Sequence, residues 1–178
     1  MKSDIIKIDN HGKGYHDAVA ETRKVARYAG MNKQDSLQLQ LLTEEMLSMV
    51  RIVTGEVNAS YWIEVEDDTF VMHMNTKALL DAEKRAELIE ASSSRKNEAA
   101  KSFLGMLRDS FERAMASDVD AQVYDLTKEE MDDLAGRDFQ EGDWDGYERS
   151  VLHKLADDVK IGIKGQDVSM TVTKSFKK

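Results

Sequence analysis

Hydrophobic residues recur at every third or fourth position over residues 37–53, which is the period of an α-helix with one buried side. This spacing predicts an amphipathic helix docked on a core. Two acids, Glu44 and Glu45, stand in the middle of the helix, away from the first turn where the helix dipole favours acids. Glu45 shares a helical face with Leu41 and Met49, so its carboxylate is expected at the rim of the buried side.

Similar periods predict further helices at residues 15–29, 78–91, 97–116 and 147–155. Gly30 is expected to end the first of these, and the serines at 92–94 to end the second. Runs rich in β-branched and aromatic residues predict a strand at residues 3–9, a hairpin at 61–66 and 70–74, and a final hairpin at 159–164 and 168–174.

Alternation in the final hairpin gives both of its strands one apolar side and one more polar side. Helices must cover the apolar side. The sequence therefore predicts an α+β fold, a two-layer α/β sandwich with helices packed on one face of a mixed, largely antiparallel sheet. The 178 residues are expected to form a single domain.

The composition changes over residues 117–148, where twelve acids face only Lys128 and Arg137. We interpret this segment as an acidic insertion or a peripheral helical element. Residues 141–146 match the first half of an EF-hand loop, but the twelfth loop position, which needs a bidentate glutamate, is Leu152. A solvated acidic turn is the better interpretation.

Charge and cysteine content exclude several function classes. The formal net charge of −9 argues against nucleic acid or an anionic membrane as partner, because both require clustered basic residues. No apolar run approaches the roughly 20 residues that cross a bilayer, and residues 1–14 lack an apolar signal-peptide region. The absence of cysteine excludes disulfides and thiolate chemistry. These features predict a cytoplasmic protein.

The usual catalytic and metal motifs are missing. The four histidines, at 11, 16, 73 and 153, lack the i, i+4 spacing of a helical zinc site, so no metal ligands are predicted. His73 is expected on the partly exposed side of its strand, opposite Met72 and Met74. Residues 11–14, His-Gly-Lys-Gly, lack the spacing of a phosphate-binding loop.

The order of the predicted elements, two helices, a hairpin, further helices and a last hairpin, resembles the histidine-kinase-like ATPase superfamily. Within this superfamily, the sequence resembles the bacterial anti-sigma-factor serine kinases. The segment TEEMLSMVRIVTG is similar to the family helix that carries an acid, then Asn, then His. The resemblance implies that Glu45 occupies the position of the family's catalytic acidic residue, which helps to activate the hydroxyl or water that attacks ATP. Met49 stands where the family has its Mg²⁺-binding Asn, and Val53 where it has His.

The family's Asp-x-Gly-x-Gly motif falls at residues 75–79. The resemblance implies that Asn75 replaces the adenine-recognising Asp, that Lys77 and Leu79 replace the two glycines, and that Gly105 keeps one glycine of the last Gly-rich segment. Methionine does not bind Mg²⁺, which takes oxygen ligands. Side chains at 77 and 79 would fill space that glycines leave open.

Three hypotheses follow. The first is a degenerate relative of this ATPase fold, with no cofactor and no kinase activity, that binds a protein such as a sigma factor or an anti-anti-sigma-like protein. Its suspected surfaces are residues 117–148 and the remodelled former pocket. The second is a divergent but working ATP-binding anti-sigma kinase, with Glu45 as the catalytic acid/base and Asn75 toward the adenine. The third is an unrelated α+β interaction domain. A homodimer is compatible with each.

Overall fold

The computed structural model describes residues 1–9, 13–54, 58–100 and 151–176. Its strands are β1 (Ile6–Ile8), β2 (Ala59–Glu66), β3 (Thr69–Lys77), β4 (Asp158–Lys164) and β5 (Asp167–Ser175). Its helices are α1 (Tyr15–Tyr28), α2 (Lys33–Thr54), α3 (Ala82–Glu90), the short 3₁₀ helix η1 (Glu98–Ala100) and α6 (Val151–Leu155). The strands form one sheet in the order β1-β2-β3-β5-β4.

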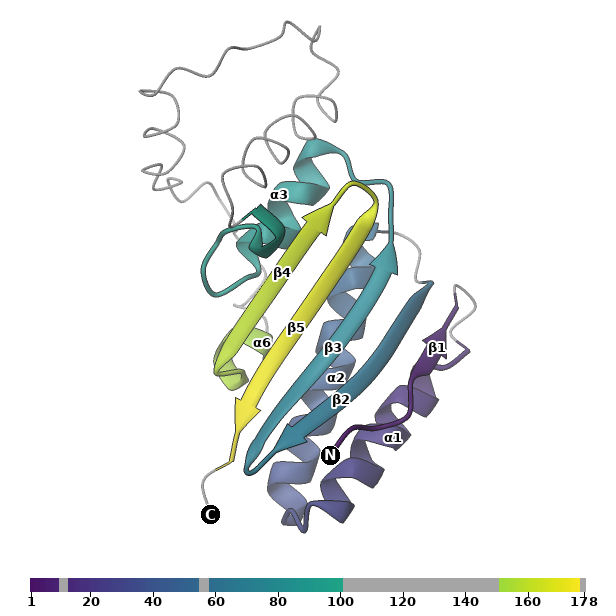
Figure 1. The fold of residues 1–178 in the computed structure, drawn as a ribbon, viewed down its shortest axis with the longest axis vertical. Helices are drawn as coiled ribbons and strands as arrows, with labels where there is room; N and C mark the ends of the chain where they lie inside the picture. The colour runs from purple at the N-terminus through teal and green to yellow at the C-terminus, as the bar shows by residue number, and fades with distance from the viewer. Residues whose placement is uncertain (10–12, 55–57, 101–150, 177–178) are drawn as a thin grey trace, which may run out of the picture.

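The predicted α+β sandwich is confirmed, with one difference in the sheet. Every neighbouring pair among the described strands is antiparallel, whereas the sequence predicted a mixed, largely antiparallel sheet. Figure 1 shows the helices α1 and α2 behind the sheet, with α1 against β1 and β2, while α3 and α6 lie beside β4. The face toward the viewer is not covered by α1, α2, α3 or α6, and we call it the open face.

The core lies between the sheet and the helices, and the alternation of the hairpins explains it. Val159, Ile161 and Ile163 of β4 are buried, and they meet the buried Val168, Met170 and Val172 of β5. On β3, Met72 and Met74 are buried against the helices, and His73 between them stands on the open face. The predicted orientation of both hairpins is therefore confirmed.

Two helices begin at other positions than the sequence analysis predicted. Helix α2 starts at Lys33, four residues before the predicted start, because the Asn32 side chain accepts a hydrogen bond from Asp35 N at 2.9 Å. Helix α3 starts at Ala82, four residues after the predicted start, because Asp81 caps Lys84 N at 2.8 Å. Polar capping side chains, rather than the apolar period, set these boundaries.

Three buried hydroxyl groups join both long helices to the sheet. Thr22 of α1, Thr43 of α2 and Tyr61 of β2 are fully buried. Their oxygens form a triangle with sides of 2.8, 2.9 and 3.0 Å. Buried hydroxyls are retained only where they find partners, so this triangle fixes how α1 and α2 sit on β2.

The β4 edge of the sheet is covered by side chains from the segment that follows α3. Asn97 donates to the carbonyl of Ile163 and accepts from its N–H, both at 2.8 Å. Ser93 does the same for Val159, with its N–H donating to the carbonyl and its hydroxyl accepting, again at 2.8 Å. These contacts occupy groups that an added strand would need.

The other edge carries a β-bulge. Lys2 pairs with Glu64 and Ile6 pairs with Tyr61, so three residues on the first strand face only two on β2. A bulge twists an edge and interrupts its hydrogen-bonding pattern. Neither edge therefore offers a long regular strand to a partner.

Several predictions lie outside the described residues. These are the helix at 97–116 beyond Ala100, the acidic segment 117–148 and the start of the helix predicted at 147–155. The described parts of these predictions are η1 and α6.

Candidate functional site

Glu45 lies in α2 and is partly buried. It follows Leu37 and Leu41 along one ridge of the helix, at successive intervals of four residues. Both leucines face away from the sheet, and their side chains are 55% and 42% exposed. Glu45 is therefore at the rim between the core and the outer surface of the helix layer, as the sequence predicted.

Asn75 lies on the opposite side of the sheet. Met74 pairs with Tyr61, whose hydroxyl contacts the helices, so the side chain of Met74 points to the helix layer. Adjacent strand residues point to opposite faces, and Asn75 is consequently exposed on the open face. The structure does not bring Glu45 and Asn75 together, because the sheet separates them.

The two residues at the family's glycine positions both project into solvent. Lys77 is exposed and lies 3.7 Å from the carboxylate of Asp167 on β5. Leu79, in the loop before α3, is 79% exposed. Neither side chain fills an interior space. The sequence predicted that both would fill the space that the glycines leave open. Gly105, the remaining residue of the predicted binding set, lies outside the described residues.

Met49 stands where the resemblance puts the Mg²⁺ ligand. It is partly buried and packs against the hydrophobic core. Its thioether offers no hard oxygen ligand. Within the described ranges, no cluster of three or more His, Asp or Glu side chains has metal-binding geometry.

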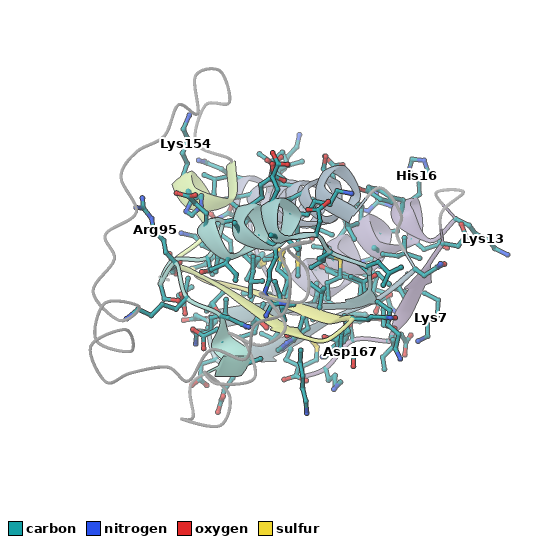
Figure 2. The ribbon with its side chains drawn as sticks, turned by 90° about the horizontal axis from the view of Figure 1, so that it is seen from above. Lys7, Lys13, His16, Arg95, Lys154 and Asp167 are labelled. Atoms are coloured by element: carbon teal, nitrogen blue, oxygen red, sulfur yellow. The ribbon has the colours of Figure 1, made fainter. Side chains whose placement is uncertain are left out.

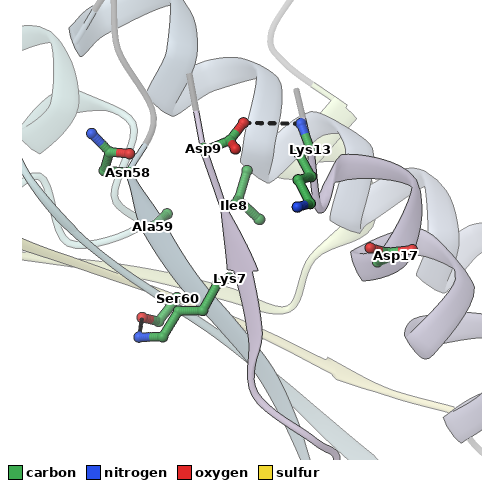
Figure 3. Close-up of a pocket in the computed structure, with 8 residues that line it drawn as sticks. All are labelled: Lys7, Ile8, Asp9, Lys13, Asp17, Asn58, Ala59 and Ser60. Carbon is green, nitrogen blue, oxygen red and sulfur yellow. Dashed lines mark hydrogen bonds between the residues drawn. The ribbon is translucent and has the colours of Figure 1, made fainter. Parts of the chain in front are cut away.

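A hollow of about 460 Å³ lies at another place, where β1 meets the start of α1 (Figure 3). It is lined by residues within or next to β1, the start of α1 and the start of β2: Lys7, Ile8, Asp9, Lys13, Asp17, Asn58, Ala59 and Ser60. Lys7 already donates to the Ser60 hydroxyl at 2.6 Å. The charges of its two lysines and two aspartates balance, so the hollow favours neither an anionic nor a cationic ligand. Neither Glu45 nor Asn75 lines it.

The open face carries a cluster that the sequence analysis missed. The rings of Trp62 and His73 stack with centroids 4.9 Å apart and an angle of 9° between their planes. Lys2 stands 5.2 Å from the Trp62 ring centroid. Glu64 accepts from Lys2 Nζ at 2.9 Å and from Trp62 Nε1 at 3.1 Å. The hairpin register, which pairs Trp62 with His73, is the signal that could have revealed it.

The surroundings of this cluster shift the pKa values of Glu64 and His73. The hydrogen bond from Lys2, supported by that from Trp62, holds the pKa of Glu64 below its usual range. Burial lowers the pKa of His73, and the nearby carboxylate of Glu64 opposes that effect only in part. The Nε2 atom of His73 is buried, has no hydrogen-bond partner in the described ranges, and lies 3.6 Å from Glu64 Oε2. The stack on Trp62 and the partial burial of the ring favour a packing role for His73 over proton transfer.

The sequence matches no protein-family model, and none of the curated proteins searched is similar to it. The described residues also contain no helix with the length and hydropathy needed to span a bilayer.

Proposed function

We propose that this chain is a regulatory protein-binding module with the element order of the histidine-kinase-like ATPases and without kinase activity. The observation that carries the proposal is the separation of Glu45 from Asn75 by the sheet. A nucleotide cannot contact both side chains from one cleft. The partly buried Met49, which packs against the core, supports the same conclusion for Mg²⁺.

The proposed partner is a protein, and the anti-sigma resemblance suggests a sigma factor or an anti-anti-sigma-like protein. The exposed ridge of α2 supports a protein-binding role, since Leu37 and Leu41 present apolar surface to solvent next to Glu45. We place the protein in the cytoplasm on the basis of its lack of cysteine. A protein-binding role holds equally if the fold is an unrelated α+β interaction domain.

Thermal unfolding with and without ATP and Mg²⁺ tests the loss of nucleotide binding. Ligand at about 100-fold excess over its Kd stabilises a protein by about 2.7 kcal/mol, which raises Tm by roughly 5–10 °C in a domain of this size. We expect no change in Tm at millimolar ATP. A saturable increase would overturn the proposal and favour the divergent kinase.

Position-specific photo-crosslinking tests the protein-binding role. A photoreactive residue at position 41 is expected to crosslink the chain to one partner protein in the cells that produce it. The same residue at position 79, which is also exposed, serves as the matched control. Equal labelling from both positions would argue against a specific partner on α2.

A further inference from the structure

The outer surface of the helix layer carries two parallel rows of side chains. One row is Leu37 and Leu41 on α2, and the other is Arg23 and Arg27 on α1, on the side opposite the buried residues of that helix. We call these four residues the outer helix patch. Figure 2 shows His16, on the same ridge of α1 as Arg23, pointing away from the sheet.

The hydroxyl contact between the helices places the two rows side by side. Thr22 Oγ1 lies 3.0 Å from Thr43 Oγ1, and the two helices are antiparallel neighbours. Arg27 is five residues along α1 from this contact, and Leu37 is six residues back along α2. At about 1.5 Å per residue, these distances are roughly 7.5 and 9 Å in the same direction. Each arginine therefore stands at about the height of one leucine.

The patch is basic although the chain is acidic. Both arginines are exposed, and in the described part of the chain neither guanidinium group has an ion-pair or hydrogen-bond partner. Lys33, at the start of α2, is also exposed. The acids on this side of α2 are the exposed Glu44 and the partly buried Glu45, so three cations face two carboxylates. A net charge of −9 makes such a local surplus of cations notable.

The spacing of the rows indicates what would bind there. Arg23 and Arg27, like Leu37 and Leu41, are four residues apart, which is one helical turn or about 6 Å. A third helix lying along α1 and α2 would present apolar and acidic side chains at the same interval. Strand addition is disfavoured, because Ser93 and Asn97 bind edge groups of β4, and β1 at the other edge has only 3 residues.

We propose that the outer helix patch binds an amphipathic helix of a partner protein, with leucine-type side chains against Leu37 and Leu41 and carboxylates against Arg23 and Arg27. This inference rests on the proposed function and names the surface and the chemistry of its partner.

A fluorescent, stapled helical peptide provides the probe. It carries leucines at i, i+4 and i+7 with glutamates along one flank, and a second peptide has lysines in place of the glutamates. Fluorescence anisotropy with the full chain is expected to show saturable binding of the acidic peptide that weakens with added salt. Binding of the lysine peptide is expected to be at least about tenfold weaker.

Variants locate the binding surface. Leu37→Gln with Leu41→Gln, and separately Arg23→Glu with Arg27→Glu, are each expected to raise Kd at least about tenfold. All four side chains face solvent, so folding is expected to be unaffected, which circular dichroism checks. Leu79→Gln and Arg95→Glu make the same changes elsewhere on the exposed surface and are expected to leave Kd within about twofold.

Three outcomes would overturn the inference. These are no binding of the acidic peptide, equal binding of the lysine peptide, or variant affinities equal to that of the parent chain. Light scattering adds a fourth: a dimer that the leucine variants dissociate would assign the patch to a second copy instead. If ATP raises Tm and the peptide still binds, only the proposed lack of nucleotide binding is overturned. If ATP leaves Tm unchanged and the peptide does not bind, only the inference about the outer helix patch is overturned.

Discussion

The hydroxyl oxygens of Tyr61 and Thr43 lie 2.9 Å apart in the core, where they join the sheet to α2. Thr22 completes the triangle from α1. Each threonine hydroxyl also reaches a carbonyl of its own helix, Ala18 O at 2.9 Å and Leu39 O at 3.1 Å. If the two threonines donate to these carbonyls, the proton between the three groups comes from Tyr61. Burial raises the pKa of Tyr61, so its hydroxyl keeps its proton at neutral pH.

This proton arrangement predicts unequal effects of its mutations. Tyr61→Phe removes the donor while both threonines keep their carbonyls, so the loss in unfolding free energy is expected to be about 1 kcal/mol. Thr22→Val with Thr43→Val leaves the buried Tyr61 hydroxyl without a partner. This unpaired hydroxyl is expected to add about 1–3 kcal/mol to the loss in unfolding free energy. Urea denaturation of each variant measures both values.

Combining the three substitutions gives the sharper result. Adding Tyr61→Phe to the double valine variant is expected to restore part of the lost stability, because no polar group is then left buried without a partner. Tyr28→Phe, at an exposed position, is the control and should stay within about 0.5 kcal/mol of the parent. Simple additivity of the three losses would contradict this account of the triangle.

The contact between Asn97 and β4 carries a second prediction. Asn97→Ala leaves the N–H and the carbonyl of Ile163 without their partner at a buried edge. The expected loss is about 2 kcal/mol, together with faster amide exchange at Ile163. Ser94→Ala, three residues earlier in the same segment and exposed, is the matched control. Unchanged exchange at Ile163 in Asn97→Ala would show that another group protects this edge.

His73 predicts a pH dependence. Its pKa in the folded protein is lowered from the ordinary value of 6.5, mainly by burial, so the unfolded chain takes up a proton first as the pH falls. The unfolding free energy is therefore expected to decrease as the pH drops from about 6.5 through the folded pKa, and to level off below it. Denaturation across this range, compared with His73→Gln, measures the contribution.

The neighbouring charges provide the control for His73. Glu64→Gln removes the carboxylate that raises the pKa of His73, so the NMR titration midpoint is expected to fall further. Lys2→Met removes a cation that lowers it, so the midpoint is expected to rise. Shifts in the same direction for both variants would show that the packing of Trp62, rather than charge, sets the pKa.

The fold was largely predictable because its signals are local. The apolar period of α2 and the alternation in the two hairpins each depend on residues close in sequence, and both predictions are confirmed. Helix starts were predicted less well. At Asn32 and Asp81 a single capping hydrogen bond, and not the apolar period, sets where the helix begins. Many Asn and Asp residues cap no helix, and a sequence does not distinguish them from those that do.

The candidate site was less predictable for a geometric reason. A shift of one residue along a strand moves a side chain to the other face of the sheet. The motif comparison placed Asn75 at the nucleotide position, but the register of β3 turns it to the open face and turns Thr76 inward, where it is buried. The motif comparison alone could not fix that register, and Gly105 lies outside the described residues.

Gly14 and Gly30 allow a matched test of packing at the ends of α1. Both have a positive φ, 89° and 70°, so alanine at either position is strained by about 1 kcal/mol. At Gly14 a Cβ atom would also lie 2.1 Å from the carbonyl oxygen of Lys7 in β1, whereas at Gly30 it would meet no atom within 4 Å. Gly14→Ala must therefore push β1 away from α1. We expect it to lose at least about 2 kcal/mol more unfolding free energy than Gly30→Ala, with weakened amide protection in β1. Equal losses in the two variants would mean that β1 is free to move and does not hold the start of α1.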